Sequence, residues 1–412
     1  MQLVEQHIIK QNSPFYKECD SLCFKTKNLY NSCLYVVRQA YIKDKVNLLY
    51  ELHNLMKGTE QYKDLPTKVS STVLLMVQKN FKSFFKANAE YYKNPEKFKG
   101  KPHLPKYLHI TEGRFVAAYT NQAVSKRVFA VSGKIRLSQT EIEFPTKIKE
   151  FKNLDCVRII PKIGHYVIDV VYTIDVKDAL KDNERYLSID IGVNNLATLV
   201  SNVKEVTPII INGKPLKSMN QFYNKKLAHY TSLLEKRNNK KTSKRTNKLS
   251  LKRKNKIDNY LHKTSKQIIT HCVENNLNTL IIGKNDNWKQ NSNMTKTNNQ
   301  NFVNIPHSRF IEMLSYKCEI EGIRVIEQEE SYTSKASFLN LDFIPKYKKG
   351  NLIKHNFSGY RKSRGMYKIK NGKCINADVN GSYNILRKVF PNAFGNGIEG
   401  IGVYPKVIAT LK

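Results

Sequence analysis

The hydrophobic and polar positions divide the chain into two parts that meet near residue 180. Gln2 to Ile9 alternates polar and apolar side chains as an edge strand does, and apolar residues then recur at helical spacing over 15–46 and 68–92. Short β segments punctuated by Pro and Gly follow, at 114–118, 128–137, 157–161 and 166–174. This order predicts a β-barrel that is interrupted by a helical insertion.

The second part predicts strands and helices in the order β-β-β-α-β-α-β-α. The expected elements are strands at 186–191, 196–201 and 207–212, a basic helical hairpin, a strand at 279–282, a helix at 306–322, a strand at 324–328, and a helix from about 378 to 389. An irregular stretch rich in Gly, Lys and Tyr precedes the last helix. The order is that of a ribonuclease H-like fold with a small insertion, so the whole chain is expected to be an α+β multidomain protein.

Composition points to a polyanionic partner. The 412 residues include 70 Lys and Arg against 34 Asp and Glu, a net charge of +36, and 40% of the chain is apolar, which is enough for ordinary cores. Because the basic residues are spread over the whole length, nucleic acid fits better than a membrane surface or an acidic protein. We expect a cytoplasmic, nucleoid-associated protein, since no apolar run reaches the roughly 18 residues that span a bilayer.

The basic stretch 214–266 is the densest part of this charge. It holds 17 Lys and Arg against two acids. A solvated helix surface is the simpler interpretation, but so many cations repel one another unless a polyanion neutralises them. Nucleic-acid contacts are therefore predicted for the basic residues near its centre, namely Lys240, Lys241, Lys244, Arg245, Lys252, Arg253 and Lys254.

Two aspartates stand where carboxylates can bind a metal ion. Asp190 lies in an apolar strand, where an unpaired carboxylate is costly, and Asp378 lies at the start of the final helix, where Asp is ordinarily a cap. Either one alone has a structural explanation, in a following turn or as that cap. Together they suit a hard divalent ion, which needs carboxylates from separate elements, and at least one further carboxylate is expected.

Four segments in this order make a specific combination. They are IDIGVNNLAT at 189–198, FIEMLSYK at 310–317, YTSKAS at 332–337 and NADVNGSYNIL at 376–386. The combination resembles TnpB, the OrfB-type accessory protein of insertion sequences, a family related to the type V CRISPR effectors. The resemblance implies an RNA-guided DNA endonuclease that takes a guide RNA from the element's end and cleaves double-stranded DNA. A monomer is expected, but the sequence does not give the oligomeric state.

The resemblance also implies a domain layout. A wedge-like β-barrel is expected at 1–12 and 100–180, with a helical recognition domain at 13–99 inserted in it. A RuvC-like nuclease domain is expected at 184–331 and 375–412, with its basic helical hairpin at 214–276 and a small target-nucleic-acid-binding insertion at 332–374.

The chain departs from the family at the second carboxylate. Family members typically carry a catalytic Glu directly after the fourth strand, where this chain has Gly283. Some branches carry a relocated Glu just before the Tyr-Thr-Ser motif, and Glu330 matches it. Strand five lies about 10 Å from strand one, at roughly 4.8 Å per strand, and a Glu side chain can cover part of that gap.

Three outcomes therefore stay open for this site. Glu330 completes a catalytic triad with Asp190 and Asp378 that binds Mg2+, or alternatively Mn2+; Glu329, on the opposite face of the strand, takes its place; or the site no longer cuts. In the last case the protein is a nuclease-inactive, RNA-guided DNA binder such as a repressor. A transposase that joins DNA ends is the weaker third function.

The insertion is the second departure. Many relatives have a zinc ribbon with two Cys-x-x-Cys pairs, whereas Cys374 is the sole cysteine of 332–374 and none of the seven cysteines forms such a pair. No zinc is expected, and the cysteines are expected to be reduced thiols. The aromatic residues of the insertion are interleaved with basic ones, so they either stack on bases or form a small core. Nucleic-acid contacts are predicted for Lys335, Tyr360, Arg361 and Arg364.

Overall fold

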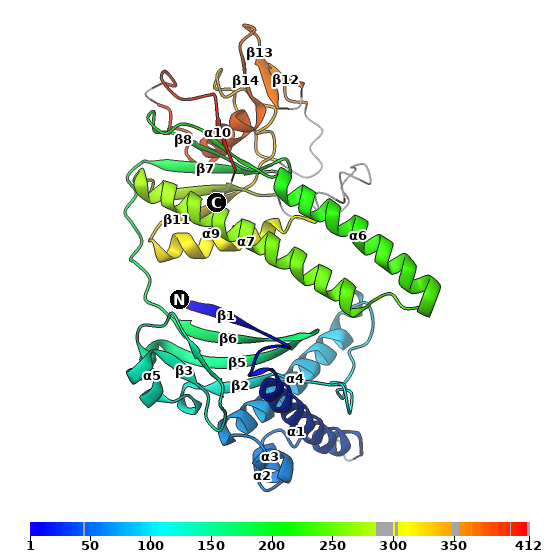
Figure 1. Ribbon diagram of the computed structural model, residues 1–412. Coiled ribbons are helices and arrows are strands. Elements are labelled where there is room, and N and C mark those ends of the chain that lie inside the picture. Colours follow the sequence, from blue (N-terminus) through cyan, green and yellow to red (C-terminus); the bar gives the residue numbers. More distant parts are fainter. Residues whose placement is uncertain are drawn as a thin grey trace. The chain divides into compact units, whose positions relative to one another are not determined.

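The computed structural model describes residues 1–43, 46–285, 300, 304–347, 354–363, 365–395 and 397–409, and Figure 1 gives its elements. The chain divides into two compact units, 1–175 and 176–412. Among the described residues, none of the helices combines the length and the apolar character that crossing a membrane requires.

The first unit contains an open antiparallel sheet in the order β1-β6-β5-β2 and a separate β3-β4 ribbon. The expected closed barrel is therefore not seen in the described residues. The strands are β1 (Gln2–Lys10), β2 (Ala117–Thr120), β3 (Lys134–Arg136), β4 (Glu143–Pro145), β5 (Leu154–Lys162) and β6 (His165–Thr173).

Side chains, not a backbone ladder, join β1 to β4. Glu5 of β1 accepts hydrogen bonds from the Thr146 hydroxyl at 2.8 Å and from the Lys147 amide at 2.9 Å. The ring of His7, also on β1, lies 4.7 Å from the ring of Phe144 on β4. Side-chain contacts therefore link β1 to the β3-β4 ribbon where a closed barrel would have strand pairing.

The helices of this unit are α1 (Tyr16–Lys43), α2 (Leu52–Met56), α3 (Glu60–Lys63), α4 (Thr67–Lys93) and α5 (Lys126–Ser132). The apolar spacing correctly predicted α1 and α4, whose inward residues share one buried core with the sheet. The strand expected at 128–137 is wrong over its first half, which forms α5. The Ser125 side chain caps that helix by accepting from the Val128 amide, and Gly133 ends it at φ +67°.

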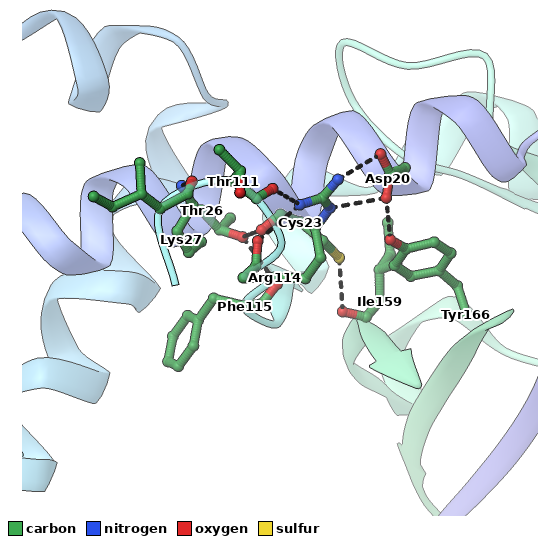
Figure 2. A network of polar contacts seen from close by, with 11 residues as sticks. Asp20, Cys23, Thr26, Lys27, Thr111, Arg114, Phe115, Ile159 and Tyr166 are labelled. Carbon is green, nitrogen blue, oxygen red and sulfur yellow. Dashed lines mark hydrogen bonds and ion pairs between the residues drawn. The ribbon is translucent and has the colours of Figure 1, made fainter. Parts of the chain in front are cut away.

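A polar network ties α1 to the sheet and to the segment before β2 (Figure 2). The Arg114 guanidinium donates to both oxygens of Asp20, at 2.8 and 2.9 Å, and the Tyr166 hydroxyl donates to Asp20 at 2.5 Å. The Thr26 hydroxyl donates to the Phe115 carbonyl at 3.0 Å, and the buried Lys27 ammonium to the Ile110 carbonyl. The charges buried in this network are therefore paired or hydrogen-bonded by the fold itself.

The second unit is built on a mixed sheet in the order β11-β10-β7-β8-β9-β15. Its strands are β7 (Tyr186–Ile191), β8 (Asn195–Ser201), β9 (Ile209–Asn212), β10 (Thr279–Gly283), β11 (Arg324–Gln328) and β15 (Lys406–Ile408). Antiparallel pairs join β7, β8 and β9, whereas β10 runs parallel to β7 and β11 parallel to β10. The element order is the one expected, with β15 as an edge strand that the sequence did not predict.

Helices cover both faces of this sheet, α7 (Lys244–Glu274) and α9 (His307–Ile320) on one and α10 (Ala377–Val389) on the other (Figure 1). The alternation along β7 decides which residue meets which layer. Leu187, Ile189 and Ile191 belong to the core with α7 and α9, whereas Tyr186 packs with α10 residues. Asp190 therefore points to the α10 side of the sheet.

The basic stretch forms the expected helical hairpin, with α6 (Lys214–Asn238) preceding α7. The stretch expected to be irregular is instead partly a small antiparallel sheet of β12 (Gly359–Ser363), β13 (Met366–Ile369) and β14 (Cys374–Asn376). Its apolar residues are few, since the buried cluster there comprises Tyr367, Ile369, Ile375 and Ala377. Because β12 is largely exposed, its sequence lacks the alternation that identifies strands.

Candidate active site

Asp190 lies one residue from the end of β7, half-buried against α10. A Cβ atom added to Gly381 of α10 would stand 3.0 Å from Asp190 Oδ2. Gly381 therefore lets the helix approach the carboxylate more closely than other residues allow. The position of Asp190 is set by strand alternation, and its close cover by this glycine.

Asp378 is the second residue of α10, and it does not cap the helix. Asn376 is the cap, since its side-chain oxygen accepts from the amides of Asp378 at 3.0 Å and Val379 at 3.1 Å. The Asp378 carboxylate is left for other partners: the Asn195 amide donates to Oδ2 at 2.6 Å, and the Arg361 guanidinium donates to Oδ1 at 3.3 Å. The structural explanation of Asp378 as a cap is thus excluded.

Glu330 follows the end of β11 and reaches back over β10. A Cβ atom added to Gly283, the last residue of β10, would stand 2.3 Å from Glu330 Oε1 and 3.0 Å from Glu330 Cδ. Because Ile282 pairs with Ile189 in parallel register, Gly283 lies level with Asp190 on the neighbouring strand. The carboxylate of Glu330 thus occupies the space that a side chain at position 283 would fill.

The two glutamates after β11 have different surroundings. Lys388 of α10 is 6% exposed and donates to Glu329 Oε2 at 2.7 Å, and the Ser331 amide donates to Glu329 Oε1 at 2.6 Å. Burial opposes ionisation of Glu329, but these donors lower its pKa below the ordinary value. Glu329 is therefore ion-paired to Lys388, whereas the carboxylate of Glu330 lies over Gly283 of the neighbouring strand.

Asn285 holds Glu330 in place. Its amide nitrogen donates to Glu330 Oε2 at 3.2 Å, and its amide oxygen accepts from the Glu330 backbone at 3.1 Å. The other carboxylate oxygen, Oε1, is buried, and within the described part of the chain it has no hydrogen-bond partner. A buried carboxylate oxygen without a donor is costly while it is ionised, so either a proton or a cation would stabilise it.

The site carries more negative charge than its surroundings neutralise. Burial and the neighbouring Asp378 raise the pKa of Asp190 to about 7, with Arg361 acting in the opposite direction. Burial, Asp190 and Glu329 raise the pKa of Glu330 to about 8, against the effect of Lys388. Both shifts mean that the protonated forms of these two carboxyl groups persist to higher pH than usual in the metal-free chain.

Asp190 and Asp378 share a cavity of about 430 Å³ that Lys214, Arg361 and Asn195 also line. The carboxylate donors suit Mg2+, a hard ion that prefers oxygen ligands, and the unpaired Glu330 oxygen fits the same demand. As the side chains stand, no three His, Cys, Asp or Glu residues in the described ranges are grouped to hold one ion. The chemistry of the donors fits a metal, while their arrangement requires adjustment to bind it.

The other polar residues of the motif at 376–386 attach α10 to its neighbours. Asn380 accepts from the Phe338 amide at 2.9 Å and donates to the Ala336 carbonyl at 2.8 Å, and Asn384 donates to the same carbonyl. Ser382 donates to backbone carbonyls of β7 and β8. The motif therefore fastens α10 to the sheet and to the start of the insertion, which places Asp378 beside Asp190.

The predicted nucleic-acid-binding residues of the hairpin lie away from this cavity. Lys240 and Lys241 are in the turn after α6, a helix of about 37 Å at 1.5 Å per residue, whose first residue, Lys214, lines the cavity. Lys244, Arg245, Lys252 and Lys254 of α7 are exposed, with Arg245 over the Tyr230 ring at 4.3 Å. Arg253 instead donates to Asn220 at 2.7 Å.

The insertion divides its predicted residues between two roles. Tyr367 is fully buried and donates to the Lys335 carbonyl at 2.7 Å, so it belongs to the small core, whereas Tyr360 is 59% exposed. Lys335 itself is exposed, and Arg361 contacts Asp378. Arg364 lies outside the described residues. The carboxylate of Asp342 bonds the Ser337 and Ser358 amides and helps to close the insertion.

Sequence reasoning assigned no role to several residues that shape this site. Asn195 and Gly381 were not singled out, although both fall inside the quoted motifs. Asn285 and Lys388 carry no sequence signal, because their partners lie 45 and 59 residues away along the chain. The motifs could therefore have drawn attention to Asn195 and Gly381, whereas the roles of Asn285 and Lys388 are visible only in the fold.

Comparisons with known proteins agree with these motifs. Residues 169–289 match the family model OrfB_IS605, described as "Probable transposase", and residues 307–385 match the "Cas12f1-like, TNB domain". These two matches confirm the predicted resemblance to TnpB. Curated proteins gave no match.

Solved structures similar to this chain include two that align over most of its length. One is a Cas12f1-sgRNA-target DNA complex, at 15% identity and a TM-score of 0.34, covering 93% of this chain and 98% of that chain. The other is the mini-RNA-guided endonuclease CRISPR-Cas_phi3, at 11% identity and a TM-score of 0.47, covering 98% of this chain and 94% of that chain.

Proposed function

We propose that this chain is an RNA-guided DNA endonuclease of a mobile element, in which a guide RNA selects the site by base pairing together with a short flanking DNA motif. The observation that carries the proposal is the Glu330 carboxylate, which fills the space above Gly283 beside Asp190. The family matches and the net charge of +36 support a guide RNA and double-stranded DNA as partners.

Asp190, Asp378 and Glu330 would hold Mg2+, with Mn2+ as a substitute. Bound there, the ions would activate water and stabilise the leaving oxygen of a phosphodiester. The chain's own residues prepare the site: Asn195 orients Asp378, and Asn285 orients Glu330. The strand order β11-β10-β7-β8-β9 supports the expected ribonuclease H-like domain, on whose sheet a RuvC-type site would lie.

The test is plasmid cleavage by the full-length protein with its own guide. RNA that co-purifies with the protein is sequenced, resynthesised with a guide for a plasmid target, and incubated with Mg2+ or with EDTA. We expect Mg2+-dependent double-strand cleavage, lost in Asp190→Ala and Asp378→Ala while guided binding in a gel-shift assay persists.

Each other result selects a different function. Guided binding without cleavage by the wild-type protein would make it a nuclease-inactive DNA binder, such as a repressor. A strand-transfer product would make it a transposase. Cleavage that survives both aspartate substitutions would remove this site from the reaction.

A further inference from the structure

The contact between Arg361 and Asp378 joins the insertion to the candidate active site. Arg361 lies on β12, and its guanidinium is 3.3 Å from Asp378 Oδ1. Both side chains line the same cavity as Asp190. Among the ion pairs of the described residues, this is the one that engages Asp190, Asp378 or Glu330.

The fold fixes this contact through a continuous path of hydrogen bonds. In the strand register, Arg361 of β12 lies opposite Tyr367 of β13. Strand β13 in turn pairs with β14, which leads directly into α10. Tyr367 is fully buried, and the Gly365 carbonyl accepts from the Ala377 amide, the residue before Asp378, at 3.0 Å. Arg361 is thus held near Asp378 by a small anchored sheet, which distinguishes it from a surface arginine on a free loop.

The guanidinium of Arg361 supplies a positive charge at the carboxylate of Asp378. With Asn195 on Oδ2 and Arg361 on Oδ1, both oxygens of Asp378 already have donors. A divalent ion at the same carboxylate would be repelled by the guanidinium charge a few ångströms away.

We propose that Arg361 is an inhibitory stand-in for the metal, which keeps Asp378 from binding a divalent ion until a nucleic-acid phosphate draws the guanidinium away. Phosphate offers Arg a bidentate partner of higher charge than a single carboxylate oxygen. Arg361 is 47% exposed, so it can change partners without unfolding the insertion. The inference rests on the proposed function, because it assumes that Asp378 is a metal ligand.

The experiment titrates Mn2+ into the full-length protein without nucleic acid and measures free Mn2+ by electron paramagnetic resonance. We expect Arg361→Ala to bind Mn2+ roughly threefold to tenfold more tightly than the wild type, from removal of one competing charge. Lys370→Ala is the matched control: it removes a positive charge from the same insertion, at an exposed position that does not line the cavity. Its affinity should equal that of the wild type.

The outcomes separate this inference from the proposed function. Equal or weaker Mn2+ binding in Arg361→Ala would overturn the inhibitory role, provided that Asp378→Asn abolishes binding. An equal gain in Lys370→Ala would reduce the effect to general charge and overturn it as well. Binding that neither Asp190→Asn nor Asp378→Asn changes, or no binding in any variant, would overturn the metal site itself and with it the inference.

Discussion

The carboxylates of Asp378 and Glu330, the two other acids of the candidate site beside Asp190, differ in their exposure and in their hydrogen bonds. Asp378 is 28% exposed, lies in a cavity and accepts hydrogen bonds from Asn195 and Arg361. Glu330 is held by Asn285 on one oxygen, while its other oxygen is buried and lacks a donor among the described residues. Both oxygens of Asp378 thus have donors, whereas one oxygen of Glu330 has none among the described residues.

The difference shows two ways in which a fold places a carboxylate. Asp378 is positioned by hydrogen bonds, through the Asn376 cap and the Asn195 amide. Glu330 is also held by hydrogen bonds, from Asn285, but its position depends on Gly283 as well, which leaves the space that its carboxylate fills. Substitutions should therefore affect the two sides differently: removing a donor loosens Asp378, and adding a side chain displaces Glu330.

The largest contrast is expected between Glu330→Gln and Glu329→Gln. Loss of an outer partner of a metal ligand typically costs 10–100-fold, so loss of a ligand charge in Glu330→Gln should cost more than about a hundredfold in cleavage. Glu329→Gln should keep cleavage but lower the free energy of unfolding by about 1–3 kcal/mol, because it weakens the partner of the buried Lys388. Guided plasmid cleavage and urea unfolding measure the two effects.

The reverse pattern would transfer the catalytic role to Glu329. Full cleavage by Glu330→Gln would remove Glu330 from the site, whatever its position beside Asp190. Guided DNA binding by both variants serves as the control for correct folding.

The next contrast adds atoms at position 283. In Gly283→Ala the new Cβ would meet Glu330 Oε1 at 2.3 Å and Ile385 Cδ1 at 2.6 Å, so both side chains must move. We expect cleavage to fall roughly 10–100-fold, as it does when an outer partner of a metal ligand is lost. Guided plasmid cleavage and thermal unfolding measure whether the loss is catalytic or general.

A compensated exchange sharpens the same point. Gly283→Glu combined with Glu330→Gly moves the carboxylate to the position usual in the family, and Ile385→Val removes the methyl group in its way. The triple variant should cleave better than Glu330→Gly alone. Equal inactivity of the two, in folded protein that binds its guide, would contradict the view that the carboxylates share one space.

Much of the second unit could be predicted from its sequence. Strong periodicity gave β7 and β11 with their observed bounds, and α10 within one residue. The motifs gave Asp190 and Asp378, and the chain position of Glu330 favoured it over Glu329. These features are local, since they depend on alternation, on a cap and on residues a few positions apart.

Other features depend on tertiary contacts that no local pattern reports. The exposed strand β12 was missed, and α5 was mistaken for a strand because its β-branched residues outweighed the Ser125 and Gly133 end signals. The space above Gly283 depends on the register of β10 and β7. The contact of Arg361 with Asp378 depends on a hairpin between them, and sequence reasoning expected only nucleic acid there.

A smaller effect on cleavage is expected from loss of the hydrogen bond between Asn195 and Asp378. Asn195→Ala removes the donor to Asp378 Oδ2, so cleavage should fall about tenfold and the Mg2+ concentration for half-maximal cleavage should rise. Asn194→Ala is the control, since that side chain bonds Lys217 at 2.8 Å and not a carboxylate. An unchanged Mg2+ requirement in Asn195→Ala would show that Asp378 needs no orienting amide.

The last contrast is a pH dependence of stability, measured without catalysis, that comes from Glu330. The pKa of Glu330 rises from an ordinary value of 4.5 to about 8 in the folded chain, so the folded state keeps a proton that the unfolded state has released within that window. The metal-free protein should therefore lose stability as pH rises from 4.5 towards 8, relative to Glu330→Gln, which cannot titrate there. Urea midpoints measured in EDTA at several pH values give the difference between the two proteins.

Mg2+ should remove this difference in pH dependence, because a bound cation favours the ionised carboxylate. Parallel curves in EDTA would mean that Glu330 is solvated in the folded protein, and the contrast with Asp378 would then rest on hydrogen bonding alone.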